Sequence, residues 1–109
     1  MVKGQIDEIL IRRKKYRDPK FSAAELAEML GLSVWKLSRI VRQEYGMRYA
    51  EVVHECRIKD AMQYLRNKKF EAYSVDDIGA MVGFGNRQSF FGAFKKIVGT
   101  TPEKYRIMA

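Results

Sequence analysis

Two stretches of the sequence gather side chains of the types that can bind phosphate oxygens and base edges. Residues 33–44 and 86–98 are each predicted to form a helix. The outer face of the first helix has no acid before Glu44, and the outer face of the second helix has none. Arginine can offer two parallel N–H donors to guanine, glutamine can bond both polar edges of adenine, and lysine and serine bind phosphate oxygens. Tryptophan can cover a thymine methyl or a sugar. The candidate DNA-contacting residues are Ser33, Trp35, Lys36, Ser38, Arg39 and Arg42 on the first helix and Asn86, Arg87, Gln88, Ser89 and Lys95 on the second.

Several of these residues also have a structural interpretation that the sequence leaves open. Trp35 could instead cover the edge of a core, and Arg39 could be a solvated or intramolecularly paired charge. Lys95 and Lys96 could serve only solubility. A further basic run within residues 12–17 could follow phosphates or form a solvated outer face.

The two helices belong to a unit that repeats at an offset of 52 residues. Ser22 and Ser74 each begin a short helix in the manner of a capping box, with an acid three residues later at the positive end of the helix. Gly31 and Gly83 can end those helices, because glycine adopts the left-handed conformation without a Cβ clash. A second helix follows each turn, so we expect two helix-turn-helix modules. The small residues expected where the paired helices cross are Ala27 and Gly79.

Residues 48–66 contain no glycine or proline and are predicted to form one long helix. At about 100° per residue its apolar stripe changes faces halfway along, which a helix packed against one core would not do. The first half is therefore expected to serve one module and the second half the other, which makes this segment a linker helix. Arg57 on it is expected to bond across to a module. The two apolar faces are Tyr49, Val52, Val53 and Cys56, followed by Ile58, Ala61, Met62 and Leu65.

The remaining elements follow from apolar spacing. Residues 3–16 are predicted to form an amphipathic helix that Pro19 ends, because proline disfavours helix at the residue before it. The connection at residues 67–73 is expected to place Phe70 or Tyr73 on the second core, and a last short helix begins near Pro102. Met62 and Met81 are expected to be packing residues. The other expected core residues are Leu26, Met29, Leu30, Leu37, Ile40, Val41, Phe90, Ala93, Phe94 and Ile97.

Composition narrows the class of protein. The 109 residues carry a net charge of +8, and the isoelectric point is near 9.7, which favours a partner with negative charge. Only one cysteine is present, and no apolar run approaches a membrane span, so a cytoplasmic protein is expected. His54 and Cys56 lie two apart on a helix and point in different directions, which suits neither a metal pair nor a nucleophile with its base. We therefore expect no enzyme, no metal and no cofactor.

One family resemblance is specific. The stretch IGAMVGFGNRQSFFGAFKKIVGTTPEKYR, with LGLSVWKLSRIVRQEYG and ECRIKDAMQYL before it, is similar to the DNA-binding domain of the AraC/XylS family of bacterial transcription regulators. The resemblance covers about residues 22–106. It implies two recognition helices that enter the major groove, with Trp35, Ser38, Arg39, Arg87 and Gln88 reaching bases. The sequence departs from the family at Phe91 and Gly92, where a small polar residue and an arginine are usual.

We therefore expect an all-α fold with two helix-turn-helix modules joined by a long linker helix. The expected division is residues 1–47 for the N-terminal helix and first module, 48–67 for the linker, and 68–109 for the second module. The expected function is sequence-specific binding of double-stranded DNA in successive major grooves and regulation of transcription, with RNA polymerase as a further candidate partner. The alternative is a basic helical module that binds protein or anionic membrane surfaces. No room remains in these residues for a dimerisation or effector domain.

Overall fold

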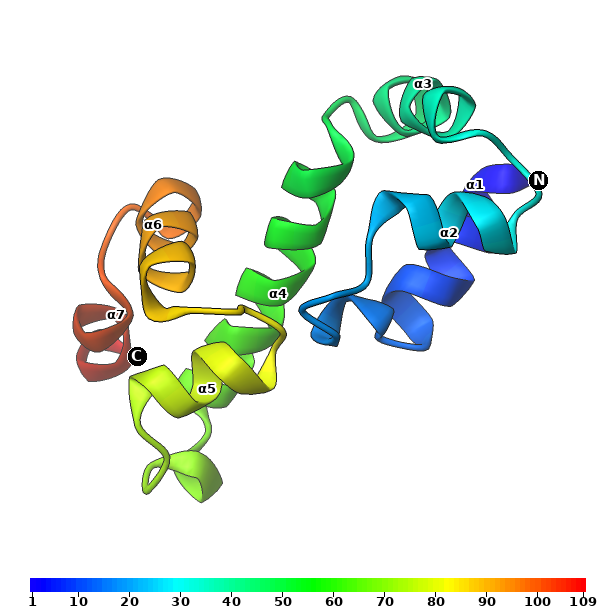
Figure 1. The fold of residues 1–109 in the computed structure, drawn as a ribbon. Coiled ribbons are helices and arrows are strands. Elements are labelled where there is room, and N and C mark those ends of the chain that lie inside the picture. The colour runs from blue at the N-terminus through cyan, green and yellow to red at the C-terminus, as the bar shows by residue number, and fades with distance from the viewer.

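The computed structural model describes residues 1–109 as helices joined by short turns, with no strand, and no helix combines the length and apolarity that crossing a bilayer requires. Two groups of helices flank a central helix, α4 (Figure 1). The expected all-α architecture of two helix-turn-helix modules on a linker helix is confirmed. The helices are α1 (Val2–Ile6), α2 (Ala23–Met29), α3 (Val34–Tyr45), α4 (Tyr49–Arg66), α5 (Val75–Met81), α6 (Arg87–Val98) and α7 (Pro102–Met108), with a π-helical segment η1 (Asp7–Arg12) and short 3-10 turns η2 (Lys15–Arg17) and η3 (Lys68–Phe70).

The linker helix α4 serves two separate hydrophobic cores, as its change of apolar face predicts. Val52 and Val53 are buried in the first core with α1, α2 and α3, and Tyr49 and Cys56 pack against it. The second core receives Ile58, Ala61 and Leu65 from α4. It also contains Ile78, Val82, Phe84, Phe90, Ala93 and Phe94. Each module thus depends on α4 for part of its interior, so α4 is a structural member of both.

The first helix of each module begins at the predicted serine. The hydroxyl oxygen of Ser22 accepts the backbone N–H of Glu25 at 3.2 Å. That of Ser74 accepts the N–H of Asp77 at 2.9 Å, and Asp77 accepts the N–H of Ser74 in return. The second module therefore has a complete capping box, which satisfies two donors that the helix start would otherwise leave free.

The same two helices end at the predicted glycines. Gly31 and Gly83 have positive φ angles of 68° and 115°. In each turn the N–H of the following residue donates to the carbonyl five positions back, at 2.9 Å for Leu32 and 3.1 Å for Phe84. This is the Schellman arrangement, and its presence in both modules directs the chain toward α3 and α6 in the same way.

The helix crossings depend on small residues. A Cβ built on Gly79 would lie 2.5 Å from the ring of Phe90, which is itself 1% exposed. Ala27 occupies the matching position in the first module and is buried. Both crossings agree with the prediction, and the second is so close that only glycine fits there without a shift of Phe90.

The predicted N-terminal helix is wrong at its C-terminal end. Helical structure stops at Arg13, and Lys14 adopts a left-handed conformation with φ of 57°. The chain then makes the turn η2, and Tyr16 is buried there. Pro19 therefore does not end the helix, because it lies beyond this turn. The helix ends earlier because Tyr16 and Arg17 leave it to contact α4.

Two expected core residues are exposed. Met29 is 50% exposed because it lies about 110° around α2 from the midpoint of Leu26 and Ala27, which face the core. Ile97 is 41% exposed and lines a cleft of about 270 Å³ between α6 and the first half of α4. Ile97 faces this cleft, whereas the next residue, Val98, packs against the second core. Met62 packs against that core as expected.

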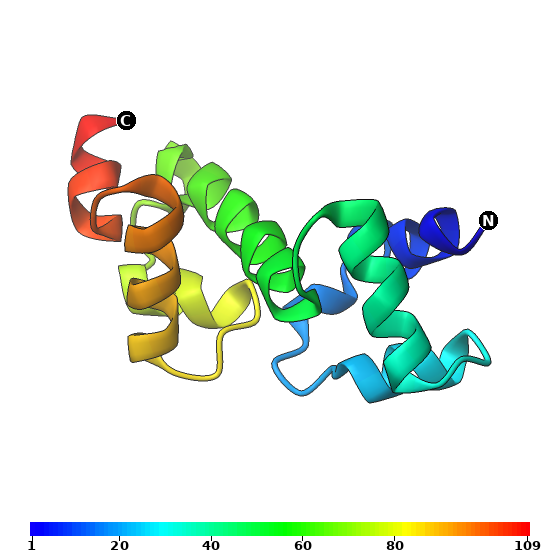
Figure 2. The same cartoon turned by 90° about the horizontal axis from the view of Figure 1, so that it is seen from above.

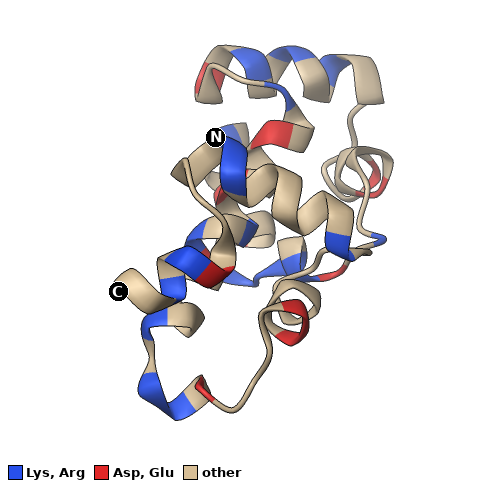
Figure 3. Cartoon of the chain, turned by 90° about the vertical axis from the view of Figure 1, so that its left-hand side faces the viewer, with Lys and Arg blue, Asp and Glu red and all other residues tan.

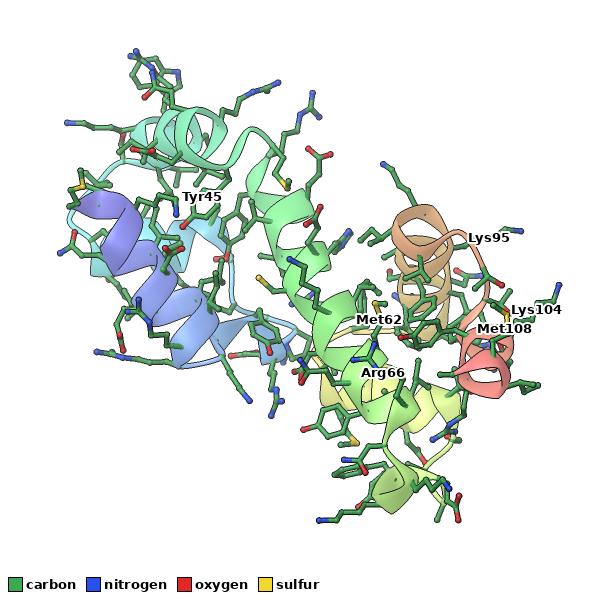
Figure 4. All side chains as sticks on the ribbon, turned by 180° about the vertical axis from the view of Figure 1, so that it is seen from behind. Tyr45, Met62, Arg66, Lys95, Lys104 and Met108 are labelled. Atoms are coloured by element: carbon green, nitrogen blue, oxygen red, sulfur yellow. The ribbon has the colours of Figure 1, made fainter.

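Long-range polar contacts hold the ends of the modules in place. The hydroxyl of Tyr45, at the end of α3, donates to Asp7 at 2.5 Å and lies between α3 and the N-terminal segment (Figure 4). In the second module the ring of Phe70 contacts that of Tyr64 edge-on at 4.7 Å, whereas Tyr73 is 44% exposed. The prediction that Phe70 or Tyr73 packs on the second core is therefore wrong, because Phe70 reaches that core only through Tyr64.

Candidate DNA interface

The outer face of α3 is exposed along its length. Ser33 caps the helix by accepting the N–H of Lys36 at 3.1 Å, and its hydroxyl hydrogen remains available to an acceptor. Trp35 is 68% exposed, so it does not cover the edge of the core. The guanidinium of Arg39 lies 5.1 Å from the centre of the Trp35 ring and has no acidic partner. The arginine is therefore oriented by an aromatic ring and keeps all its N–H donors free of carboxylates. The other predicted residues on this exposed face are Lys36, Ser38 and Arg42.

The outer face of α6 is built differently. Asn86 caps the helix by accepting the N–H of Ser89 at 2.8 Å. One terminal nitrogen of Arg87 donates to both oxygens of Asp76, at 2.8 and 2.9 Å, and its other terminal nitrogen is 3.7 Å from Glu103. Its guanidinium also lies 4.2 Å from the ring centre of Phe91. Arg87 is thus exposed, but two carboxylates and a ring fix its position.

The two arginine–aromatic pairs are related by the internal repeat. At the offset of 52 residues, Trp35 corresponds to Arg87 and Arg39 corresponds to Phe91. The arginine and the aromatic residue have exchanged positions between the modules, while the four-residue spacing that brings them together on a helix is kept. This exchange gives Phe91 a defined contact and places the two arginines one helical turn apart in the frame of their modules.

Position 92 is open. A Cβ built on Gly92 would meet nothing within 4 Å. The glycine is therefore not required by packing within the chain.

Charge on the two helices is distributed unequally. On α3, at the top of Figure 3, Lys and Arg recur along the helix, and the first acid is near its C-terminal end. On α6 they occur only near the two ends, as Arg87 and as Lys95 with Lys96 (Figure 3). Lys95 is exposed and points away from the rest of the chain (Figure 4).

The two helices face the same way. In Figure 2, α3 and α6 lie on either side of α4 and run in roughly the same direction from their N-termini. The positive ends of both helix dipoles, capped by Ser33 and Asn86, are therefore on the same side of the molecule. A single elongated polyanion could meet both ends at once.

Sequence reasoning missed Asp76 and Glu103 as partners of Arg87. Asp76 lies in the first turn of α5, where the helix dipole already accounts for an acid. Its counterpart in the first module is Ala24, so a comparison of the two repeats could have singled it out. The ring of Phe91 could have been found from its four-residue spacing to Arg87.

The remaining reactive side chains form no catalytic group. Burial raises the pKa of the Cys56 thiol and so disfavours the thiolate, and burial lowers the pKa of His54. No three His, Cys, Asp or Glu side chains are grouped so that they could hold a metal ion. The helical faces described above are therefore the strongest candidate site.

Comparison with known proteins identifies helix-turn-helix proteins with similar sequences and folds. Residues 26–108 match a family described as "Helix-turn-helix domain". The chain is 31% identical over 108 residues to a probable transcription factor, PqrA, of Proteus vulgaris, covering 97% of this chain and 86% of that protein. It superposes with a TM-score of 0.83 on the C-terminal domain of the two-component response regulator yesN from Fusobacterium nucleatum, at 28% identity over 96% of this chain and 97% of that one. The DNA-binding domain of AdpA, solved in complex with a target DNA, has the same fold, with a TM-score of 0.84 and 21% identity over 96% of this chain and 89% of that one.

Proposed function

Because the chain belongs to the AraC/XylS-type family of helix-turn-helix transcription regulators, we propose that it binds double-stranded DNA sequence-specifically and regulates bacterial transcription. The helices α3 and α6 enter successive major grooves on one face of the duplex. This family is one of DNA-binding domains and not of enzymes. The membrane-surface alternative has no structural feature in its favour.

The observation that best supports this proposal is the pair of equivalent helices held on either side of one linker helix. At 1.5 Å per residue, the 18 residues of α4 span about 27 Å. Successive major grooves on one face of B-DNA are about 34 Å apart. The molecule is 43 Å in its longest dimension, so both helices can meet a duplex without a second copy of the chain.

The side chains take two roles in this proposal. Arg39, Trp35 and Ser38 read base edges in the half-site of the first module, and Arg87 and Gln88 read them in the other. Phosphate oxygens are bound around these contacts. The residues proposed for phosphate contact are Ser33, Lys36, Arg42, Asn86, Ser89 and Lys95.

Three further parts of the proposal concern context. The division into residues 1–47, 48–67 and 68–109 describes the two reading modules and their linker. RNA polymerase is a proposed partner, since a transcription regulator acts on it directly or by exclusion. The cytoplasm, where the bacterial chromosome lies, is the proposed location.

Footprinting tests the proposal. On DNA selected by the protein from genomic fragments, we expect two protected segments about one helical turn apart, in sites that need no two-fold symmetry. A single short footprint, or an absolute need for palindromic sites, would contradict the arrangement of α3 and α6.

Salt dependence tests the electrostatic part. If about six basic side chains meet phosphates, log Kd against log salt concentration should have a slope of magnitude near 5, because each contact contributes about 0.9. Anionic vesicles serve as the control polyanion. Binding to DNA that is insensitive to salt, or preference for the vesicles, would overturn the assignment.

A further inference from the structure

A buried polar cluster lies where the N-terminal turn η2 meets the linker helix. Arg57 and Asp60 are the two charged residues buried in the protein, at 8% and 7% exposure, and both belong to α4. They lie between the first core, which includes Tyr16, and the second, which includes Phe84. Buried charges destabilise a fold unless they are paired, so their partners show what this cluster holds together.

Asp60 is paired entirely with η2. Its carboxylate accepts the hydroxyl of Tyr16 at 2.7 Å and two N–H groups of Arg17, at 2.7 and 3.0 Å. The paired arrangement with Arg17 is the strongest geometry available to an arginine and a carboxylate. Burial and the adjacent carboxylate raise the pKa of Tyr16, so this residue stays protonated and donates. Asp60 therefore fastens η2 to the middle of α4.

Arg57 extends the cluster to the second module. Its Nε donates to the carbonyl of Tyr16 at 2.7 Å, and a terminal nitrogen donates to the carbonyl of Asp18 at 3.3 Å. Its guanidinium lies 5.4 Å from the ring centre of Phe84, which follows the turn of the second module. Arg57 thus contacts η2 and the second module at once, which confirms the expectation that it bonds across the linker.

Gly83 brings the two modules into direct contact. A Cβ at Gly83 would lie 2.3 Å from the carbonyl oxygen of Tyr16 and 2.8 Å from Nε of Arg57. At the equivalent Gly31 in the first module, a Cβ would meet nothing within 4 Å. The turn that has the same backbone role in both modules therefore has a second role in only one, where it packs on the N-terminal turn.

We propose that Tyr16, Arg17, Arg57, Asp60 and Gly83 form an inter-module lock that fixes the angle between the two modules and so determines the half-site spacing that the protein accepts on DNA. This inference rests on the proposed function. None of the five residues lies on the outer face of α3 or α6, so they act on specificity by positioning. The modules are also connected by α4, which contributes side chains to both cores.

The spacing that a rigid pair of modules accepts is narrow. One inserted base pair moves a half-site by about 3.4 Å along the duplex and about 35° around it. A locked protein should therefore lose at least about tenfold in affinity for each base pair added or removed, the equivalent of one lost bidentate base contact. Modules that can tilt relative to each other should lose about threefold or less.

The test uses three lock variants and one matched control. Asp60→Asn keeps the shape and an acceptor for Tyr16 but removes the charge, Arg17→Lys keeps the charge but not the paired donors, and Gly83→Ala inserts the Cβ that meets Tyr16. Gly31→Ala is the control, because it strains an equivalent left-handed glycine without a neighbour to displace. Circular dichroism checks that each variant is folded, and the conservative Asp60→Asn and Arg17→Lys variants keep the test decisive if Gly83→Ala unfolds.

Two measurements are needed. The first measurement is the affinity for the selected bipartite site and for sites with one base pair added or removed between the half-sites. It shows how much change in half-site spacing the protein tolerates. Spin-label distances in the free protein, with labels at Glu28→Cys and Lys104→Cys in a Cys56→Ser background, report the angle without DNA. We expect a narrow distance distribution and a steep spacing penalty for the wild type and Gly31→Ala, and a broad distribution and shallow penalty for the lock variants.

The outcomes separate the two proposals. Narrow distances and an unchanged spacing penalty in folded Asp60→Asn and Arg17→Lys would overturn the lock, even though DNA binding is intact. A wild type that protects no bipartite site would overturn the proposed function, and the distance distributions would still decide whether the lock exists.

Discussion

Replacing Arg39 tests whether α3 reads bases, because the structure leaves this guanidinium free of carboxylates and orients it on Trp35. Arg39→Lys keeps the charge but loses the planar fork that can bond guanine at two points. The stack on an exposed ring contributes about 0.5–1 kcal/mol to the orientation, and the bidentate contact about 1–3 kcal/mol to discrimination. We therefore expect Arg39→Lys to bind the preferred site about 5- to 150-fold more weakly and random DNA almost unchanged.

The assay is fluorescence anisotropy on the selected site and on random duplex, each over a series of salt concentrations. Arg39→Ala should lose about as much on the preferred site and relax the preference at one base position, with an unchanged salt slope. Arg42→Ala is the matched control, since Arg42 lies on the same helix and is proposed to bind phosphate. It should weaken both DNAs equally and reduce the slope by about 0.9. Equal losses on both DNAs for Arg39→Ala, or wild-type binding by Arg39→Lys, would refute base reading by this residue.

Three further predictions concern the second module and stability. Phe91→Ala removes the ring beneath Arg87 and should cost about 0.5–1 kcal/mol in competition assays on the distal half-site only; a loss spread over both half-sites would contradict the local role of the ring. Gly79→Ala should lower the free energy of unfolding by about 1–3 kcal/mol, because its Cβ overlaps Phe90. Gly92→Ala should raise it by about 0.5–1 kcal/mol, because position 92 is open and alanine favours a helix. Both are measured by urea denaturation, and effects of the same sign would refute this packing argument. Burial lowers the pKa of His54 in the folded protein, so the unfolded state takes up the proton first and stability should fall as the pH decreases below about 6.5. His54→Gln should flatten that dependence in urea titrations at pH 5 and pH 7.5, and an unaltered slope would exclude His54 as its source.

The features that could be predicted from sequence are local ones. The capping serines Ser22 and Ser74 and the left-handed glycines Gly31 and Gly83 are recognisable because their hydrogen bonds span three to five residues. The two faces of the linker helix are recognisable because a helix converts sequence spacing directly into direction. The outer faces of α3 and α6 follow from the same periodicity, and so does the four-residue spacing of Arg87 and Phe91.

Contacts between segments far apart in the chain could not be predicted from these local patterns. Arg87 meets Asp76 across 11 residues, and Arg17 meets Asp60 across 43. An arginine on an acid-free stretch looks free in the sequence, whether or not another element brings a carboxylate to it. The exposure of Met29 could not be predicted for a related reason, because the part of α2 that is covered depends on where the N-terminal segment packs.

Two equivalent helix-turn-helix modules on a shared helix can be predicted from sequence, because capping, turn geometry and apolar periodicity all act within a few residues. The differences between the modules, and the contacts that hold them together, depend instead on how distant segments pack in the fold. In the fold, Arg87 is paired with Asp76, whereas Arg39 has no carboxylate partner. Gly83 packs against Tyr16, whereas nothing lies within 4 Å of a Cβ built on Gly31. The physical reason is that pairing and close approach depend on the distance between atoms in space, and for segments far apart in the chain that distance is set by the packing of the two cores on α4.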